Sequence, residues 1–88
     1  MKLYAVLLGG SGGPGRLAED HETVFVVADN EQEAKAAAKP KWSGYGRGHV
    51  DAISSVEVVD GHAITLVPTD ALVEPETVDF NDVPFDDA

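Results

Sequence analysis

The sequence contains no cysteine, so disulfide bonds, thiolate metal sites and cysteine-based catalysis are excluded for these 88 residues. Basic residues are few: six Lys and Arg stand against sixteen Asp and Glu, which gives a formal net charge of -10 at pH 7. Nucleic acids and anionic membranes bind concentrated basic surfaces, so neither is expected as a partner. The sequence also lacks a run of about 18 apolar residues, the length that a membrane helix needs, and we therefore expect a cytoplasmic protein.

The chain is long enough for one domain, and its hydrophobic content of 43% is typical of a globular protein. The acidic charge is concentrated at one end. Residues 1–67 contain nine acidic and six basic residues, whereas residues 68–88 contain seven acidic residues and no basic one. The sequence therefore predicts a domain over residues 1–67 and an acidic C-terminal extension over residues 68–88. The extension also carries apolar side chains at Leu72, Val73, Val78, Phe80, Val83 and Phe85.

Two segments, residues 2–8 and 23–28, are apolar at both odd and even positions, which is typical of strands that are buried on both faces. The stretch after the second strand predicts a helix, because Asp29 or Asn30 can cap its N-terminus and Pro40 ends it. The inner stripe of this helix is expected to consist of Ala34, Ala37 and Ala38.

Residues 50–59 are expected to form a third strand and residues 62–67 a fourth, joined by a type I′ hairpin turn at Asp60 and Gly61. These elements predict a small α+β domain of the order β-β-α-β-β. Its sheet is expected to be four-stranded and mostly antiparallel, with one helix packed on it.

A glycine-rich loop, GSGGPG over residues 10–15, contains the pattern G-x-G-x-x-G that occurs in dinucleotide-binding domains. That use requires a crossover of about ten residues or more, including a helix, and only about seven residues separate Gly15 from the next strand. We therefore expect no nucleotide and no other cofactor. Consecutive backbone N–H groups in such a loop can bind a small anion, which makes Gly9, Gly10 and Arg16 candidate ligand-binding residues.

Two histidines open predicted strands: His21 the second strand and His49 the third, with Asp51 two residues further on. Residues two apart on a strand share a face, and an imidazole beside a carboxylate can orient a ligand or act as a base. Because all three residues lie near strand ends, we expect them at one end of the sheet, as the candidate catalytic residues. The alternative is that they bond only to neighbouring loop backbone. No metal is predicted.

Four stretches, MKLYAVLLGG, HETVFVVA, KWSG and HVDAISSVEVVDGHAITL, resemble in order and spacing a small bacterial family known as domain of unknown function 1543, over about residues 1–67. The family more often has aspartate where this chain has Glu22. The resemblance implies a domain that occurs once or twice per chain, here in a single copy, and it implies no established activity. The family's motif positions fall on Gly9, Gly10, His21, Glu22, Trp42, Gly44, His49 and Asp51.

Strands that are apolar on both faces need two covering layers, and the chain supplies one helix. We therefore expect either a homodimer that covers the second face or an acidic extension folded back over it. The leading hypothesis is a non-enzymatic module that associates with itself, or with another protein through the acidic extension. One alternative is a metal-binding or small-ligand-binding protein, or an enzyme, that uses His21, His49 and Asp51. Another is an anion-binding protein that uses the glycine-rich loop.

Overall fold

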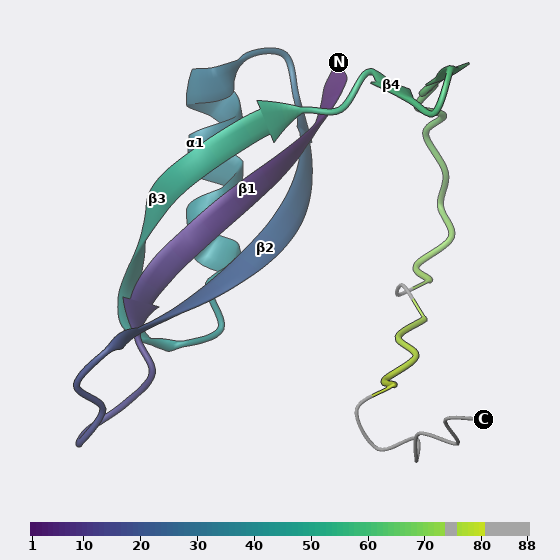
Figure 1. The fold of residues 1–88 in the computed structure, drawn as a ribbon. Coiled ribbons are helices and arrows are strands. Elements are labelled where there is room, and N and C mark those ends of the chain that lie inside the picture. Colours follow the sequence, from purple (N-terminus) through teal and green to yellow (C-terminus); the bar gives the residue numbers. More distant parts are fainter. Residues whose placement is uncertain (74–75, 81–88) are drawn as a thin grey trace.

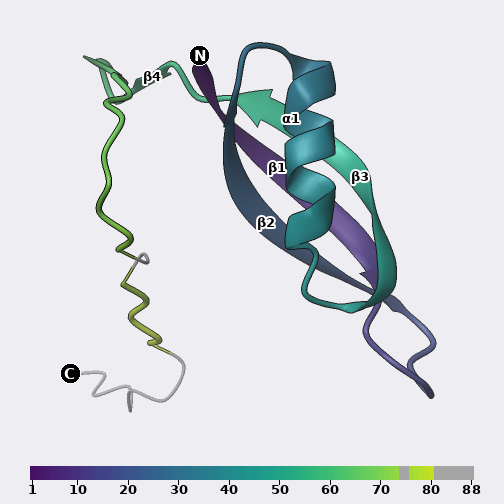
Figure 2. The ribbon, with the colours of Figure 1, turned by 180° about the vertical axis from the view of Figure 1, so that it is seen from behind.

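The structure, a computed structural model, describes residues 1–73 and 76–80 of the chain (Figure 1). Three strands form one antiparallel sheet in the order β2-β1-β3, with β1 at Lys2–Ser11, β2 at Glu19–Ala28 and β3 at Tyr45–Ser55. The helix α1, Glu31–Ala38, packs on one face of this sheet and continues into a short 3-10 helix, η1, at Lys39–Lys41. Figure 1 shows α1 behind the sheet and Figure 2 shows it in front. The predicted α+β class and antiparallel pairing are confirmed.

The central strand is β1, which pairs with β2 along its whole length and with β3 from Tyr4 onward. Its residues Tyr4, Val6 and Leu8 are buried, and they form the core together with Val26 and Ala28 of β2 and with two alanines of α1. Since side chains alternate across a strand, the residues between them point to the other face of the sheet. This double role explains why β1 is apolar at odd and even positions alike.

The hairpin between β1 and β2 extends further than the sequence predicts. Ser11 still pairs with Glu19, so the connecting loop is confined to residues 12–18. Within it, Gly13 and Gly15 adopt φ angles of +132° and +83°, in a region that glycine enters without steric cost. The G-x-G-x-x-G pattern therefore lies in a connection between antiparallel strands, not in the strand-to-helix turn of a dinucleotide-binding fold.

The N-terminus of α1 is capped as predicted, by Asn30. The Asn30 side chain accepts a hydrogen bond from the Glu33 N–H at 2.9 Å, and the Glu33 carboxylate accepts one from the Asp29 N–H at 3.3 Å. Ala34 and Ala38 are fully buried against the sheet. The prediction was wrong for Ala37, which is exposed, because this short helix contacts the sheet through one row of residues four apart.

Trp42 follows η1 and packs, half-buried, against the edge of the core. Its indole N–H donates a hydrogen bond to the Tyr45 carbonyl at 3.3 Å. The ring lies so close to neighbouring backbone that an added Cβ at Gly10 would be 2.9 Å from it, and one at Gly48 would be 2.6 Å away. The absence of a side chain at Gly10 and Gly48 therefore leaves the space that the indole occupies.

The predicted hairpin at Asp60 and Gly61 is present. It joins β4, Val58–Val59, to β5, His62–Ala63, and both turn residues have positive φ angles, as a type I′ turn requires. However, these strands form a separate two-stranded ribbon, so the predicted single four-stranded sheet is replaced by a three-stranded sheet and a ribbon. The physical reason is that the third strand ends at Ser55 rather than running on to residue 59, so the hairpin begins beyond the end of the sheet and its two strands pair only with each other.

The described part of the acidic extension, residues 68–73 and 76–80, lies to one side of the sheet in both views (Figures 1 and 2). Its apolar side chains at Leu72, Val73, Val78 and Phe80 are exposed. Val83 and Phe85, which the sequence suggested as covering residues, lie outside the described residues. The described part of the chain contains no helix that is both long and apolar enough to cross a membrane.

Candidate functional site

The face of the three-stranded sheet that points away from α1 is the candidate functional surface, and we call it the open face. On β1 it consists of Leu3, Ala5, Leu7 and Gly9, which alternate with the buried core residues. Directly paired residues of neighbouring strands share a face, so β2 contributes the partners of these four residues, namely Val27, Phe25, Thr23 and His21. The open face therefore has an apolar part around Phe25 and a polar end around Gly9.

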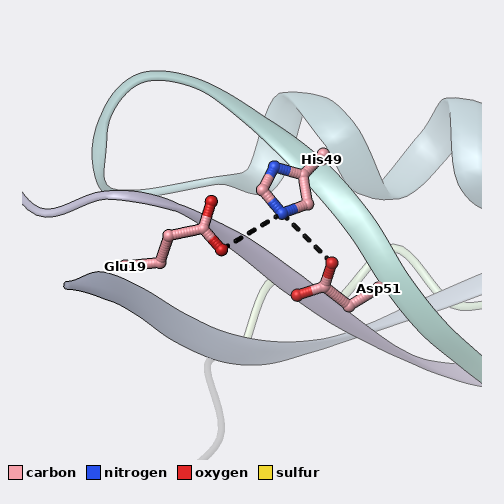
Figure 3. Close-up of side chains that lie close together, drawn as sticks. All are labelled: Glu19, His49 and Asp51. Carbon is pink, nitrogen blue, oxygen red and sulfur yellow. Dashed lines mark ion pairs between the residues drawn. The ribbon is translucent and has the colours of Figure 1, made fainter.

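The polar end carries a cluster of four side chains, Glu19, His21, His49 and Asp51. The Asp51 carboxylate lies 3.0 Å from His21 Nε2 through one oxygen and 3.1 Å from His49 Nε2 through the other. Glu19 Oε1 lies 3.5 Å from His49 Nε2 and 3.9 Å from His21 Nε2. Figure 3 shows Glu19 and Asp51 on either side of the His49 ring.

Strand register explains why these residues meet. Gly9 of β1 pairs with His21 on one side and with His49 on the other, so the two imidazoles flank a position that has no side chain. A Cβ at Gly9 would lie 2.6 Å from an Asp51 carboxylate oxygen and 2.9 Å from the His21 ring. The absence of a side chain at Gly9 therefore leaves the space in which the cluster forms.

An irregularity in β3 directs Asp51 into this space. Leu7 pairs with Ala52 but Leu8 pairs with Val50, so Asp51 is an extra residue with no partner of its own on β1. Such a bulge changes the direction in which the side chain points. Asp51 consequently reaches both histidines, one on its own strand and one on β2.

All four side chains of the cluster are accessible to solvent, with 33% of the Asp51 side chain and 46–54% of the other three exposed. A ligand can therefore reach the cluster without any rearrangement of the fold. The structure brings the predicted residues His21, His49 and Asp51 together, and their assignment as catalytic residues stays a prediction.

The three residues proposed for anion binding are not brought together. Gly9 lies beneath the cluster on the open face, whereas Gly10 lies against Trp42 on the other face. Arg16 forms an ion pair with Asp20 across the loop. A common site for Gly9, Gly10 and Arg16 therefore has no geometric support.

Glu22 lies next to His21 in the sequence, but its side chain contacts Ser43 and is not part of the cluster. Its carboxylate accepts hydrogen bonds from the Ser43 backbone N–H at 2.6 Å and from the Ser43 hydroxyl at 2.7 Å. These two bonds, the side-chain one first, hold the pKa of Glu22 below its ordinary value, against a smaller opposing effect of burial. The two hydrogen bonds between Ser43 and Glu22 hold the segment after Trp42 against β2.

Sequence reasoning missed Glu19 as a member of the cluster. The prediction started the second strand at Thr23, so Glu19 was assigned to the loop, whereas β2 begins at Glu19 itself. Glu19 lies two residues before His21, and that spacing on a strand places both side chains on one face. A predicted second strand that began at Glu19 would have identified this residue as a candidate member of the cluster.

The fold and the cluster define a small α+β domain with an open sheet face and a histidine-carboxylate group at one end of it. Residues 16–66, more than half of the chain, match the family described as Domain of Unknown Function (DUF1543). The chain belongs to this family, as the motifs in its sequence predicted. No curated protein and no solved structure matches the chain.

Proposed function

We propose that this chain is a self-associating domain, in which two copies pack against each other through the apolar part of the open face, around Phe25. The observation that carries the proposal is the contrast between the two faces of the sheet. Under α1, Tyr4, Val6 and Leu8 are at most 3% exposed, whereas Phe25 and Val27 on the open face are 57% and 47% exposed. Exposed apolar surface of this kind on a small domain is typical of a contact with a partner.

The energetic gain from covering this face is substantial for so small a protein. The exposed 57% of Phe25 corresponds to on the order of 110 Å² of a surface of about 200 Å². At about 25 cal/mol per Å², its burial contributes roughly 3 kcal/mol per copy. Small domains have little core of their own, so a contribution of this size is large relative to a total stability of about 5–15 kcal/mol.

A second copy is a better occupant of the open face than the acidic extension. The apolar side chains of the described extension are exposed, and Leu72 in particular is 98% exposed. Two sheet faces of the same kind can also pack face to face, about 10 Å apart, with their side chains interdigitated. The proposed dimer is therefore formed by two open faces related by a two-fold axis.

Light scattering of the full chain over a range of concentrations tests this proposal. We expect twice the chain mass at high concentration, and the chain mass for Phe25→Lys, because a charge would be buried in the interface. Leu17→Lys is the matched control, since Leu17 is an equally apolar residue that lies fully exposed in the β1–β2 loop. A full chain that stays monomeric at every concentration would contradict the proposal.

A further variant distinguishes the acidic extension from a second copy as the occupant of the open face. If the extension covered the open face, Phe80→Lys would lower the melting temperature of a monomeric chain, because Phe80 is one of its apolar residues. If a second copy covers it, Phe80→Lys leaves both the mass and the melting temperature unchanged.

A further inference from the structure

We propose that Glu19, His21, His49 and Asp51 form a binding site for a divalent transition-metal ion of the zinc class. The sequence alone predicted no metal and left metal binding by His21, His49 and Asp51 as an alternative, because it could not show whether these side chains converge. The structure adds a fourth residue and a common direction. Imidazole nitrogen and carboxylate oxygen are both ordinary zinc ligands.

The spacing of the ligand atoms fits one central ion. Two ligand atoms at about 2.0–2.2 Å from a tetrahedral zinc ion lie about 3.3–3.6 Å apart. In the cluster, Glu19 Oε1 lies 3.5 Å from His49 Nε2 and 3.9 Å from His21 Nε2, and Asp51 lies 3.0 Å from His21 Nε2 through one oxygen and 3.1 Å from His49 Nε2 through the other. One ligand atom each from Glu19, His49 and Asp51 lies within 4.8 Å of the other two. Movements of these three exposed side chains can therefore bring their ligand atoms onto one ion, and His21, which contacts Asp51, lies beside them as the fourth ligand.

The charge of the cluster also favours a cation. Two carboxylates lie at one end of the open face, and the ion pairs that Glu19 and Asp51 form within the described residues are with histidines alone. The nearby Arg16 is paired with Asp20 instead. A divalent cation would neutralise both carboxylates and take the imidazoles as neutral ligands.

The mixture of ligands selects the class of metal. Calcium and magnesium prefer sites made of oxygen atoms, whereas imidazole nitrogen favours zinc and its transition-metal neighbours such as cobalt. With two imidazoles among four ligands, the site should discriminate strongly between Zn²⁺ and Mg²⁺. The exposure of the side chains leaves room for a water molecule on a bound ion.

The experiment uses the full chain without an affinity tag. Zn²⁺ binding is measured by calorimetry and by the rise in melting temperature, and Co²⁺ binding by its visible absorption, which reports coordination geometry. We expect binding by the wild type and no effect of Mg²⁺ at the same concentration. His49→Ala and Asp51→Asn should each weaken Zn²⁺ binding at least about tenfold, the lower end of what loss of a supporting residue costs a metal site.

His62→Ala is the matched control, because His62 lies in the β4–β5 ribbon and its ring contacts the Asp60 carbonyl, outside the cluster. It should bind Zn²⁺ as the wild type does. Gly9→Ala gives a second test that removes no ligand: its methyl group would occupy the space beside Asp51, so Zn²⁺ affinity should fall while the circular dichroism spectrum is retained.

Absence of Zn²⁺ binding to the wild type would overturn the proposal, and so would wild-type affinity in His49→Ala. The outcome is separate from that of self-association. Phe25→Lys, the variant expected to be monomeric, should bind Zn²⁺ with unchanged affinity, because all four ligands belong to one chain. Loss of Zn²⁺ binding in a folded Phe25→Lys protein would overturn the assignment of the site to a single chain.

Discussion

Replacing Gly48 with alanine should destabilise the domain, because the new methyl group has no room beside Trp42. The added Cβ would lie 2.6 Å from Cγ, 2.8 Å from Cδ2 and 3.0 Å from Cβ of Trp42. Carbon atoms pack at about 3.5–4.0 Å, so a shift of roughly 1 Å is required. Two of the three contacted atoms form the root of the side chain, and rotation of the ring about the Cβ–Cγ bond cannot move them away. Either the whole Trp42 side chain must leave its position or the backbone at Trp42 or in β3 must shift.

Overpacking of this kind typically costs about 1–3 kcal/mol, and we expect the upper half of that range for Gly48→Ala. For a domain of 60–100 residues each kcal/mol lowers the melting temperature by about 4–8 °C, so the loss should be on the order of 10 °C. Trp42 is the only tryptophan of the chain, and its fluorescence emission should shift with the displaced ring.

Gly46→Ala is the control for this experiment. Gly46 has a φ angle of +65° and open space around its added Cβ, so alanine there introduces backbone strain without a clash. It should lower stability by about 1–2 kcal/mol and leave the Trp42 emission unchanged. A Gly48→Ala protein that is as stable as the wild type, with unchanged emission, would refute the packing argument.

Two further predictions concern local contacts. Ser43→Ala removes the larger cause of the lowered pKa of Glu22, so that pKa should rise toward its ordinary value in an NMR titration. A lowered carboxyl pKa stabilises the fold above the unfolded-state pKa, and this stabilisation is lost as the pH falls through the folded-state pKa. The variant should therefore be less stable than the wild type at neutral pH and differ little from it in acid. An equal loss of stability at both pH values would contradict this prediction. Asn30→Ala should cost about 1 kcal/mol in urea denaturation, whereas Asn30→Gly should cost only a few tenths, and an Asn30→Ala protein as stable as the wild type would show that the cap contributes nothing.

The sequence was most informative where a single residue determines local geometry. Asn30 and Pro40 located the helix, because a capping side chain and a missing N–H act within one turn. Asp60 and Gly61 located the hairpin, because few other residues tolerate two positive φ angles. The two-sided apolar pattern of residues 2–8 fits the central strand β1, but the same pattern in residues 23–28 wrongly predicted burial on both faces, because β2 is an edge strand on which Phe25 and Val27 are 57% and 47% exposed.

Properties that depend on how separate segments meet were less predictable. The number of strands in the sheet depended on where the third strand ends, and nothing local in residues 50–59 marks Ser55 as that end. The cluster depended on Gly9 lying between two histidines and on an extra residue in β3, and both are matters of register. Register follows from the whole sheet and cannot be read from one strand. The domain boundary at residue 68, a cytoplasmic location and a protein partner for the acidic extension stay predictions.

Self-association through the open face is tested most directly by labelling a single introduced cysteine, in a chain that has none of its own. Thr23→Cys places the thiol on the open face two residues from Phe25, where Thr23 pairs with Leu7, and Ala37→Cys places it on the exposed side of α1. The rate of reaction with a maleimide is then measured over a range of protein concentrations. Labelling of Thr23→Cys should slow as the concentration rises, while labelling of Ala37→Cys stays constant. A Thr23→Cys rate that is the same at every concentration would contradict association through this face.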